Sequence, residues 1–164
     1  MLGECYMDTD FNTEKICKIT NETLNAFDAL ATSTDDGKYR FCLHETTETS
    51  VQELINVWPP YTYFQPHKHP FFAETKVLLE GRVLVLLFDE SGSVTEHIIM
   101  DTETEVRILR LAPDVIHTNI ALSKVIFLET TPGPFIREKN NIYLNTYPQK
   151  MTVEDVKKFI AEYV

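Results

Sequence analysis

The chain has 164 residues, of which 43% are hydrophobic and 11% are aromatic. This length and composition predict one globular domain with a buried core and exclude an intrinsically disordered chain. The net charge of −10 excludes the basic surface that nucleic-acid binding needs, and it would repel an anionic membrane.

The sequence shows no pattern of a secreted or membrane-spanning protein. Residues 1–12 contain no basic stretch followed by an apolar one, and the longest apolar run, residues 83–88, is too short to cross a bilayer. Cys5, Cys17 and Cys42 have no CxxC spacing, so we expect reduced thiols rather than disulfides or a zinc ribbon. We therefore expect a cytoplasmic protein that binds neither membranes nor nucleic acids.

Residues 1–36 are predicted to form an N-terminal helical extension. Leu24, Phe27 and Leu30 recur with helical spacing, and Asn21 is a candidate N-cap before them. The polar segment 32–38, which contains Gly37, then ends the helical pattern.

Residues 37–136 contain a series of short β-prone segments without helices between them. The segments are 38–43, 51–58, 61–67, 74–80, 82–88, 94–100, 105–111, 115–122 and 125–131. Many short strands with close turns predict an all-β antiparallel sandwich or barrel. Because residues 83–88 are apolar at every position, we expect that strand to be buried on both faces or to lie at a subunit contact.

Residues 137–164 are predicted to be a tail that ends in a helix. Thr152 and Asp155 resemble a capping box at its start. The apolar residues of the helix then form one stripe, which consists of Val153, Val156, Phe159 and Ile160. We expect this helix to pack on the outside of the barrel or on a partner.

Four side chains of the metal-ligand type stand out in the strand region. His67 and His69 are one residue apart, which places both on one face of a strand. Glu74 on the next strand can face them, and His117 on a later strand can complete the set. Three imidazoles and one carboxylate make a site for one divalent transition metal. Zinc is satisfied by four ligands, whereas Fe, Mn or Ni prefers octahedral geometry with two further positions, and the sequence leaves this choice open.

The spacing of these residues resembles the first motif of the cupin superfamily, in which two histidines and a glutamate precede a turn glycine. Here the motif is His67-x-His69, Glu74 and Gly81, and we expect Gly81 to adopt a positive φ. His117 lies where the second cupin motif supplies its histidine. The strings at 40–45, 51–70, 77–92 and 116–135 further resemble WbuC-type cupin-fold metalloproteins. The resemblance implies a single double-stranded β-helix, or jelly-roll barrel, between the two terminal segments.

The chain departs from the cupin pattern at three positions. Tyr61 replaces a glycine that commonly stands six residues before the first histidine, and Ala121 replaces an asparagine after His117. Before His117, the usual proline-x-glycine turn is Ala112-Pro113-Asp114, and Asp114 is expected to reach the left-handed region in place of glycine.

Further side chains are candidates for the surroundings of the metal. His44 resembles a histidine that follows an arginine-containing strand in WbuC-type proteins, and it or Tyr63 is a candidate for acid–base catalysis. Equally, His44 could be a surface loop histidine beside Glu45. If the strand before His67 runs without a bulge at Pro66, Tyr61, Tyr63 and Gln65 share its inward face, where they either contact a ligand or form barrel core. By the same alternation Asn119 points with His117. For Lys76 the simpler expectation is a solvated lysine at the mouth of the barrel. If it faces inward instead, it would lose its proton or find a carboxylate. The candidate substrate-binding residues are Tyr61, Gln65, Asn119 and Lys76.

Two functional hypotheses follow. In the first, the protein is a small-molecule metalloenzyme whose metal activates an oxygen of the substrate or a water molecule. The WbuC resemblance implies a sugar or nucleotide-sugar substrate in surface polysaccharide biosynthesis, with isomerase, epimerase or oxygenase chemistry. In the second, it is a non-catalytic, metal-dependent carbohydrate-binding or regulatory module. The apolar strand and the last helix also favour a homodimer.

Overall fold

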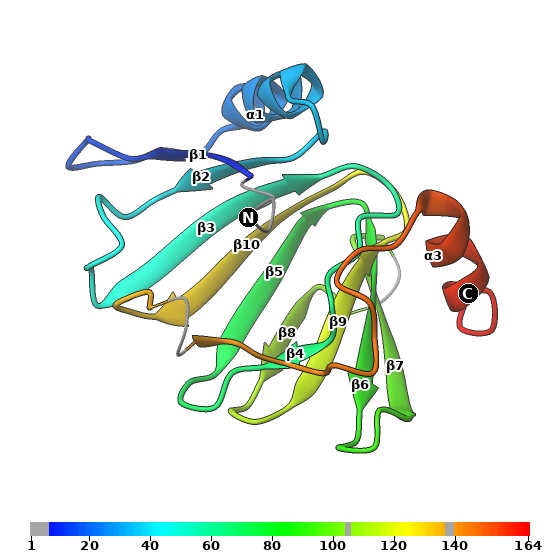
Figure 1. The fold of residues 1–164 in the computed structure, drawn as a ribbon. Coiled ribbons are helices and arrows are strands. Elements are labelled where there is room, and N and C mark those ends of the chain that lie inside the picture. Colours follow the sequence, from blue (N-terminus) through cyan, green and yellow to red (C-terminus); the bar gives the residue numbers. More distant parts are fainter. Residues whose placement is uncertain (1–6, 104–105, 137–139) are drawn as a thin grey trace.

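The computed structural model describes residues 7–103, 106–136 and 140–164. Within these residues two β-sheets face each other, and each carries a helix on its outer face (Figure 1). The prediction of a β-rich sandwich with helices in both terminal segments is therefore confirmed. The jelly-roll winding of its strands and the domain boundaries stay predictions.

The first sheet has six strands and carries one of the four predicted ligands. Its order is β1-β2-β3-β10-β5-β8, and all neighbours are antiparallel except β1 and β2. The strands are β1 (Asp8–Phe11), β2 (Tyr39–Cys42), β3 (Val51–Trp58), β10 (Val125–Pro132), β5 (Glu74–Glu80) and β8 (Ile108–Leu111).

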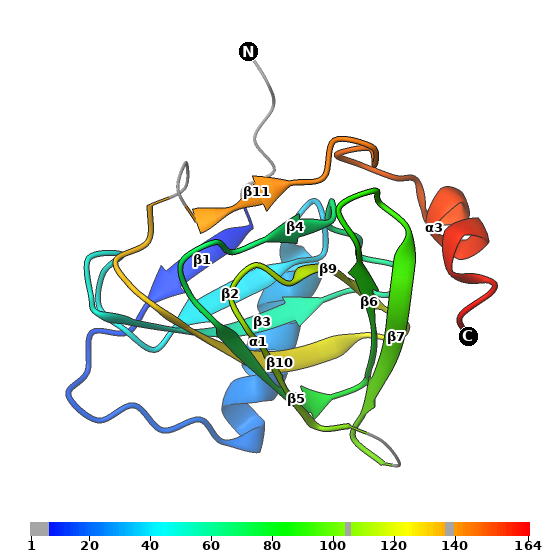
Figure 2. The same ribbon diagram turned by 90° about the horizontal axis from the view of Figure 1, so that it is seen from below.

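The second sheet has five strands and carries two predicted ligands, with a third in the residues that follow β4. Its order is β11-β4-β9-β6-β7, and β11 lies beside β4 at one edge (Figure 2). The strands are β11 (Ile142–Tyr143), β4 (His67–Lys68), β9 (Ile116–Ala121), β6 (Arg82–Phe88) and β7 (Val94–Asp101).

Strand β6 is buried on both faces, as its composition predicts. Val83 and Val85 point between the sheets into a core with Trp58, whereas Leu84 and Leu86 point to the outer face of their sheet. The outer face is covered by the chain's own C-terminal helix. The outer apolar face of β6 is therefore buried within the same chain.

The C-terminal helix, α3 (Val153–Ile160), begins where the sequence predicts. The Thr152 side chain accepts a hydrogen bond from the Asp155 N–H and caps the helix. Val156 and Ile160 are buried against the outer face of β6 and β9. The apolar stripe thus attaches the tail to the second sheet.

The N-terminal helix, α1 (Asn21–Ser33), covers the first sheet. Its N-cap is Thr20 rather than Asn21, because Thr20 and Thr23 satisfy each other's backbone N–H groups in a capping box. Phe27 and Ala31 are buried against the outer face of β2 and β3. The predicted helix is therefore correct, and its cap is wrong by one residue.

Segment 61–67 was predicted as a strand but is largely irregular, and only His67 of it lies in a strand. Pro66 has no N–H to donate, and Tyr61 has a φ of 64°, which a regular strand does not allow. Strands β1 and β11 were not predicted, since the first has two aspartates among four residues and the second has two residues.

Three turn positions singled out in the sequence adopt the left-handed region. Gly81 has a φ of 88°, and a Cβ at this position would lie 2.0 Å from the Lys124 carbonyl oxygen. Asp114 has a φ of 64°, as predicted for a substitute for glycine, and Tyr61 has the same φ. Tyr61 and Asp114 thus keep a backbone conformation that glycine adopts readily. Because each of them has a side chain, this conformation is strained.

Cys17 is exposed and Cys42 is buried, and both are free thiols. Cys5 lies outside the described residues. Among the described helices, none is long and apolar enough to span a membrane.

Candidate metal centre

Three histidines meet between the two sheets. His67 on β4 pairs directly with His117 on β9, and His69 follows two residues after His67. The ring centroids of His67 and His117 are 4.7 Å apart, and one ligand nitrogen from each of the three rings lies within 4.8 Å of the others. The His-x-His pattern and the strand register thus place the triad where it can bind a metal ion.

Backbone carbonyl oxygens orient all three rings. The Nδ1 of His67 lies 2.9 Å from the Gln65 oxygen, that of His69 lies 2.8 Å from the Asn140 oxygen, and that of His117 lies 3.1 Å from the Val115 oxygen. A carbonyl oxygen can only accept, so each Nδ1 must carry the proton. In a neutral ring the Nε2 lone pair is then free for a metal, which is the usual arrangement of metal-binding histidines.

Glu74 reaches the histidines from the first sheet. Its Oε1 lies 2.7 Å from His117 Nε2, and its Oε2 lies 3.5 Å from His69 Nε2. The Glu74 side chain is 3% exposed. Glu74 therefore lies against two of the three histidines from the opposite sheet, whereas the group placed to hold one ion consists of the three histidines.

Two atoms of this group have no hydrogen-bond partner among the described residues. His117 Nε2 and Glu74 Oε1 are buried and lie close together, but without the geometry of a hydrogen bond. Two ligand atoms bound to one cation at about 2.1 Å each come within about 3 Å of one another. A cation among the Nε2 atoms and the carboxylate would satisfy His117 Nε2 and would share Glu74 Oε1 with Lys76, so these residues fit a divalent transition metal.

The surroundings of each ligand set its charge. Burial, followed by the effect of His117, lowers the pKa of His67 to about 3, which keeps this ring neutral. Burial opposes the ionisation of Glu74, but Lys76 and His117 hold the pKa of its carboxyl well below the usual value. Burial also opposes the protonation of His69, yet Glu74 outweighs it and raises the pKa of that ring. The site therefore holds a buried carboxylate and a neutral imidazole.

Lys76 faces inward and contacts a carboxylate, so the simpler expectation of a solvated lysine at the barrel mouth is wrong. It is 4% exposed, and its Nζ is in direct ionic contact with Glu74 Oε1. Asn119 also faces inward, on the same side of β9 as His117, and is 4% exposed. Lys76 and Asn119 line a cavity of about 10 Å³ whose remaining walls are apolar. Such a cavity holds about one water molecule.

Tyr61, Tyr63 and Gln65 do not share an inward face with the histidines. Tyr61 and Tyr63 pack on the outer face of the second sheet, where the Tyr63 hydroxyl donates to the Pro148 oxygen. Gln65 donates to the Leu144 and Tyr147 oxygens. The alternation fails because the chain is irregular before Pro66, so residues on either side of it face opposite ways.

The contacts of His44 are with residues other than the proposed metal ligands. The ring is buried on the first sheet, where Nδ1 accepts from the Glu53 N–H at 2.9 Å and the ring meets Phe11 edge-on. Burial lowers the pKa of His44. Its catalytic role, like that of Tyr63, stays a prediction.

Two aromatic rings that contact the histidines were not predicted from the sequence, nor was a third aromatic residue, Phe71, which follows His69 by two positions. The ring of Phe72 stacks on His69 with centroids 4.8 Å apart, and that of Tyr143 lies 5.7 Å from His67. Phe71 is 77% exposed and Tyr143 is 48% exposed. We call Phe71, Phe72 and Tyr143 the mouth of the site. Because Phe71 and Phe72 follow His69 closely in the sequence, their place near the site could have been predicted. No local sequence pattern indicates that Tyr143 lies there.

One family model matches this sequence. It is described as "Domain of unknown function (DUF6016)", and it matches residues 19–100, which is half of the chain. The chain belongs to the DUF6016 family. The match includes His67, His69 and Glu74 and ends before His117. No curated protein matches this DUF6016 chain.

Solved structures resemble this DUF6016 chain in fold. The capsular polysaccharide assembling protein CapF from Staphylococcus aureus matches 68% of this chain with a TM-score of 0.56 and 11% identity. Oxalate oxidase in complex with the substrate analogue glycolate matches 81% of it, and 75% of its own chain, with a TM-score of 0.51 and 13% identity. Oxalate decarboxylase from Bacillus subtilis matches 76% of it, and 32% of its own chain, with a TM-score of 0.51 and 16% identity.

These neighbours are cupin-fold proteins, and at such low identity the likeness shows the fold alone. The chain therefore shares the fold of these proteins, and its place in the cupin superfamily stays a prediction. The DUF6016 chain spans about a third of the length of the CapF chain it matches, since 33% of that chain is covered.

Proposed function

We propose that this protein binds one divalent transition metal through His67, His69, His117 and Glu74. The observation that carries the proposal is the common orientation of the rings, since three backbone carbonyls hold Nδ1 and leave Nε2 free. Zinc, iron, manganese and nickel all accept this set of imidazoles and one carboxylate. When bound, the metal would supply Lewis-acid activation of a substrate oxygen or of water.

We further propose that a substrate meets the metal from the mouth rather than from the core. The inner cavity of about 10 Å³ is far below the roughly 300 Å³ of a small-molecule pocket. His67 is half-buried and lies on the side of Tyr143, whereas His117 is 1% exposed. The chain's own residues would thus keep substrate and bulk solvent away on the inner side, so that a substrate would approach His67 from the mouth.

Aromatic rings at the mouth support a sugar or nucleotide-sugar as the substrate, because their faces stack on sugar rings. The WbuC-like sequence strings suggest surface polysaccharide biosynthesis, and CapF, a fold neighbour, is a capsular polysaccharide assembling protein. We propose a metal-dependent isomerase-, epimerase- or oxygenase-type reaction on such a substrate. A cytoplasmic location and a homodimer stay predictions.

The mouth can be tested with a panel of nucleotide sugars and the metal-loaded protein. We expect the Phe71→Ala/Tyr143→Ala variant to lose about tenfold or more in affinity, because each stacked ring contributes about 1 kcal/mol. Leu30→Ala, which removes an exposed apolar side chain from α1, should bind like the wild type. Equal affinity of the mouth variant and the wild type would refute the proposed approach.

A non-catalytic carbohydrate-binding module is the second candidate. It is favoured by the positions of His44 and Tyr63, since their hydrogen bonds go to Glu53 and Pro148 and not to the histidine cluster. Turnover of a panel member that is lost in His44→Ala would support the enzyme. Binding without turnover across the panel would support the module.

A further inference from the structure

We propose that Lys76 is an internal counter-ion that holds Glu74 in the metal-free protein and turns to Asn119 when a metal binds. The inference rests on the proposed metal centre. It adds that the metal and the Lys76 side chain compete for the Glu74 carboxylate. It also assigns a use to the small cavity beneath the ligands.

The competition follows from the contacts of Glu74. Lys76 Nζ and His117 Nε2 both lie against the same oxygen, Oε1. Lys76 and Glu74 are 4% and 3% exposed, so water screens neither charge. A divalent metal bound at this oxygen would stand next to a buried ammonium group, and the two cations would repel each other. Metal binding is therefore more favourable if Lys76 moves away.

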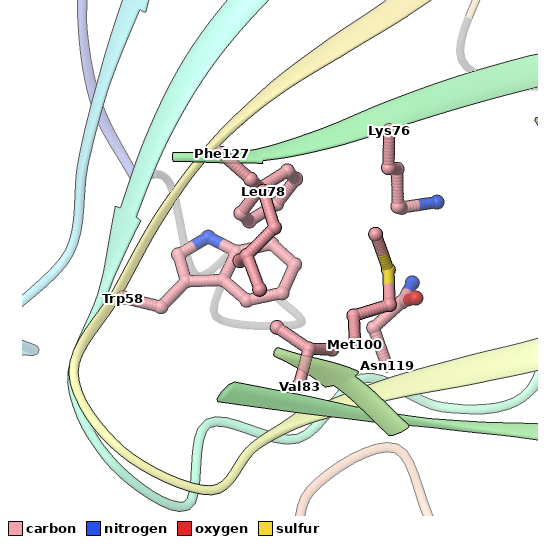
Figure 3. Close-up of a pocket in the computed structure, with 7 residues that line it drawn as sticks. All are labelled: Trp58, Lys76, Leu78, Val83, Met100, Asn119 and Phe127. Carbon is pink, nitrogen blue, oxygen red and sulfur yellow. The ribbon is translucent and has the colours of Figure 1, made fainter. Parts of the chain in front are cut away.

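The cavity provides a place for the displaced ammonium group. Lys76 from β5 and Asn119 from β9 lie at the same end of it, away from Trp58 (Figure 3). Asn119 Oδ1 is a buried acceptor without a hydrogen-bond partner among the described residues. The ammonium group has three donors and contacts Glu74 Oε1 in its present position, so donors remain for Asn119. One water in the cavity could bridge the two groups.

This arrangement predicts that Lys76 weakens metal affinity and stabilises the metal-free fold. Without a metal, Lys76 compensates the buried charge of Glu74. With a metal, the same ammonium group must move, and Asn119 lowers the cost of the move by accepting a hydrogen bond. The two residues should therefore act together on metal affinity.

The test is a double-mutant cycle on the full chain, with Zn²⁺ affinity measured by competition with a chelator. We expect Lys76→Met to bind Zn²⁺ about tenfold or more tightly, the size of effect typical of groups next to metal ligands. Its metal-free Tm should fall, and the rise in Tm on adding Zn²⁺ should be larger than in the wild type. Lys76→Gln, which is also neutral, gives the same readout if the methionine variant fails to fold.

Asn119→Leu completes the cycle. It should weaken Zn²⁺ binding in the presence of Lys76 and have little effect in the Lys76→Met background. Lys158→Met on α3 removes an exposed lysine and should change neither quantity. Unchanged or weaker binding by both Lys76 variants, or additive effects of the two sites, would overturn the inference. A wild type that binds no Zn²⁺ would instead refute the metal centre itself.

Discussion

Replacing His67 and His69 together with alanine is expected to abolish stoichiometric metal binding. The change removes two of the four proposed ligands and leaves His117 and Glu74, which cannot enclose a divalent transition metal. Elemental analysis of the purified protein should find about one metal ion per chain in the wild type and a trace in the variant. Neither ring lies among the buried apolar residues of the core, so the fold should survive the change.

The matched control is His97→Ala. His97 lies on β7 and is exposed, and it takes no part in the histidine cluster. It should retain the full metal content, which shows that the loss does not follow from any histidine substitution. Full metal content in the double variant would show that the ion binds elsewhere.

Replacing Glu74 with alanine is expected to destabilise the metal-free protein by about 3–5 kcal/mol, the usual cost of leaving one member of a buried ion pair alone. Lys76 would keep a buried ammonium group without a carboxylate in contact. The measurement is the free energy of unfolding in urea with a chelator present. Glu96→Ala, at an exposed position of β7, should change this free energy by less than about 0.5 kcal/mol.

The double variant Glu74→Leu/Lys76→Met separates charge from packing. It replaces both members of the buried pair with apolar side chains, so it should recover most of the stability that Glu74→Ala loses. A variant as unstable as Glu74→Ala would mean that the shape of Glu74, rather than its charge, supports the fold.

The parts of the site that follow from short sequence patterns were predictable. β3, β5 and β6 have the predicted bounds, because turn residues separate them and Gly81 turns the last pair. Alternation with period two placed His67 with His69 and His117 with Asn119. Strand pairing alone then brings His67 against His117.

The parts that depend on long-range contacts were not predictable. The C-terminal segment supplies the Asn140 oxygen to His69 and the Tyr143 ring to His67, although both lie more than 70 residues further along the chain. The same segment takes up the hydrogen bonds of Tyr63 and Gln65, which were predicted to face a ligand. No residue spacing in the sequence predicts these contacts.

The most direct test of the metal centre is X-ray absorption spectroscopy on the wild-type protein loaded with Zn²⁺. The proposed site predicts three imidazole nitrogens and one carboxylate oxygen at about 2.0–2.2 Å, with no sulfur in the coordination shell. Fewer than two imidazoles, or a thiolate ligand from a cysteine, would contradict the assignment of His67, His69, Glu74 and His117.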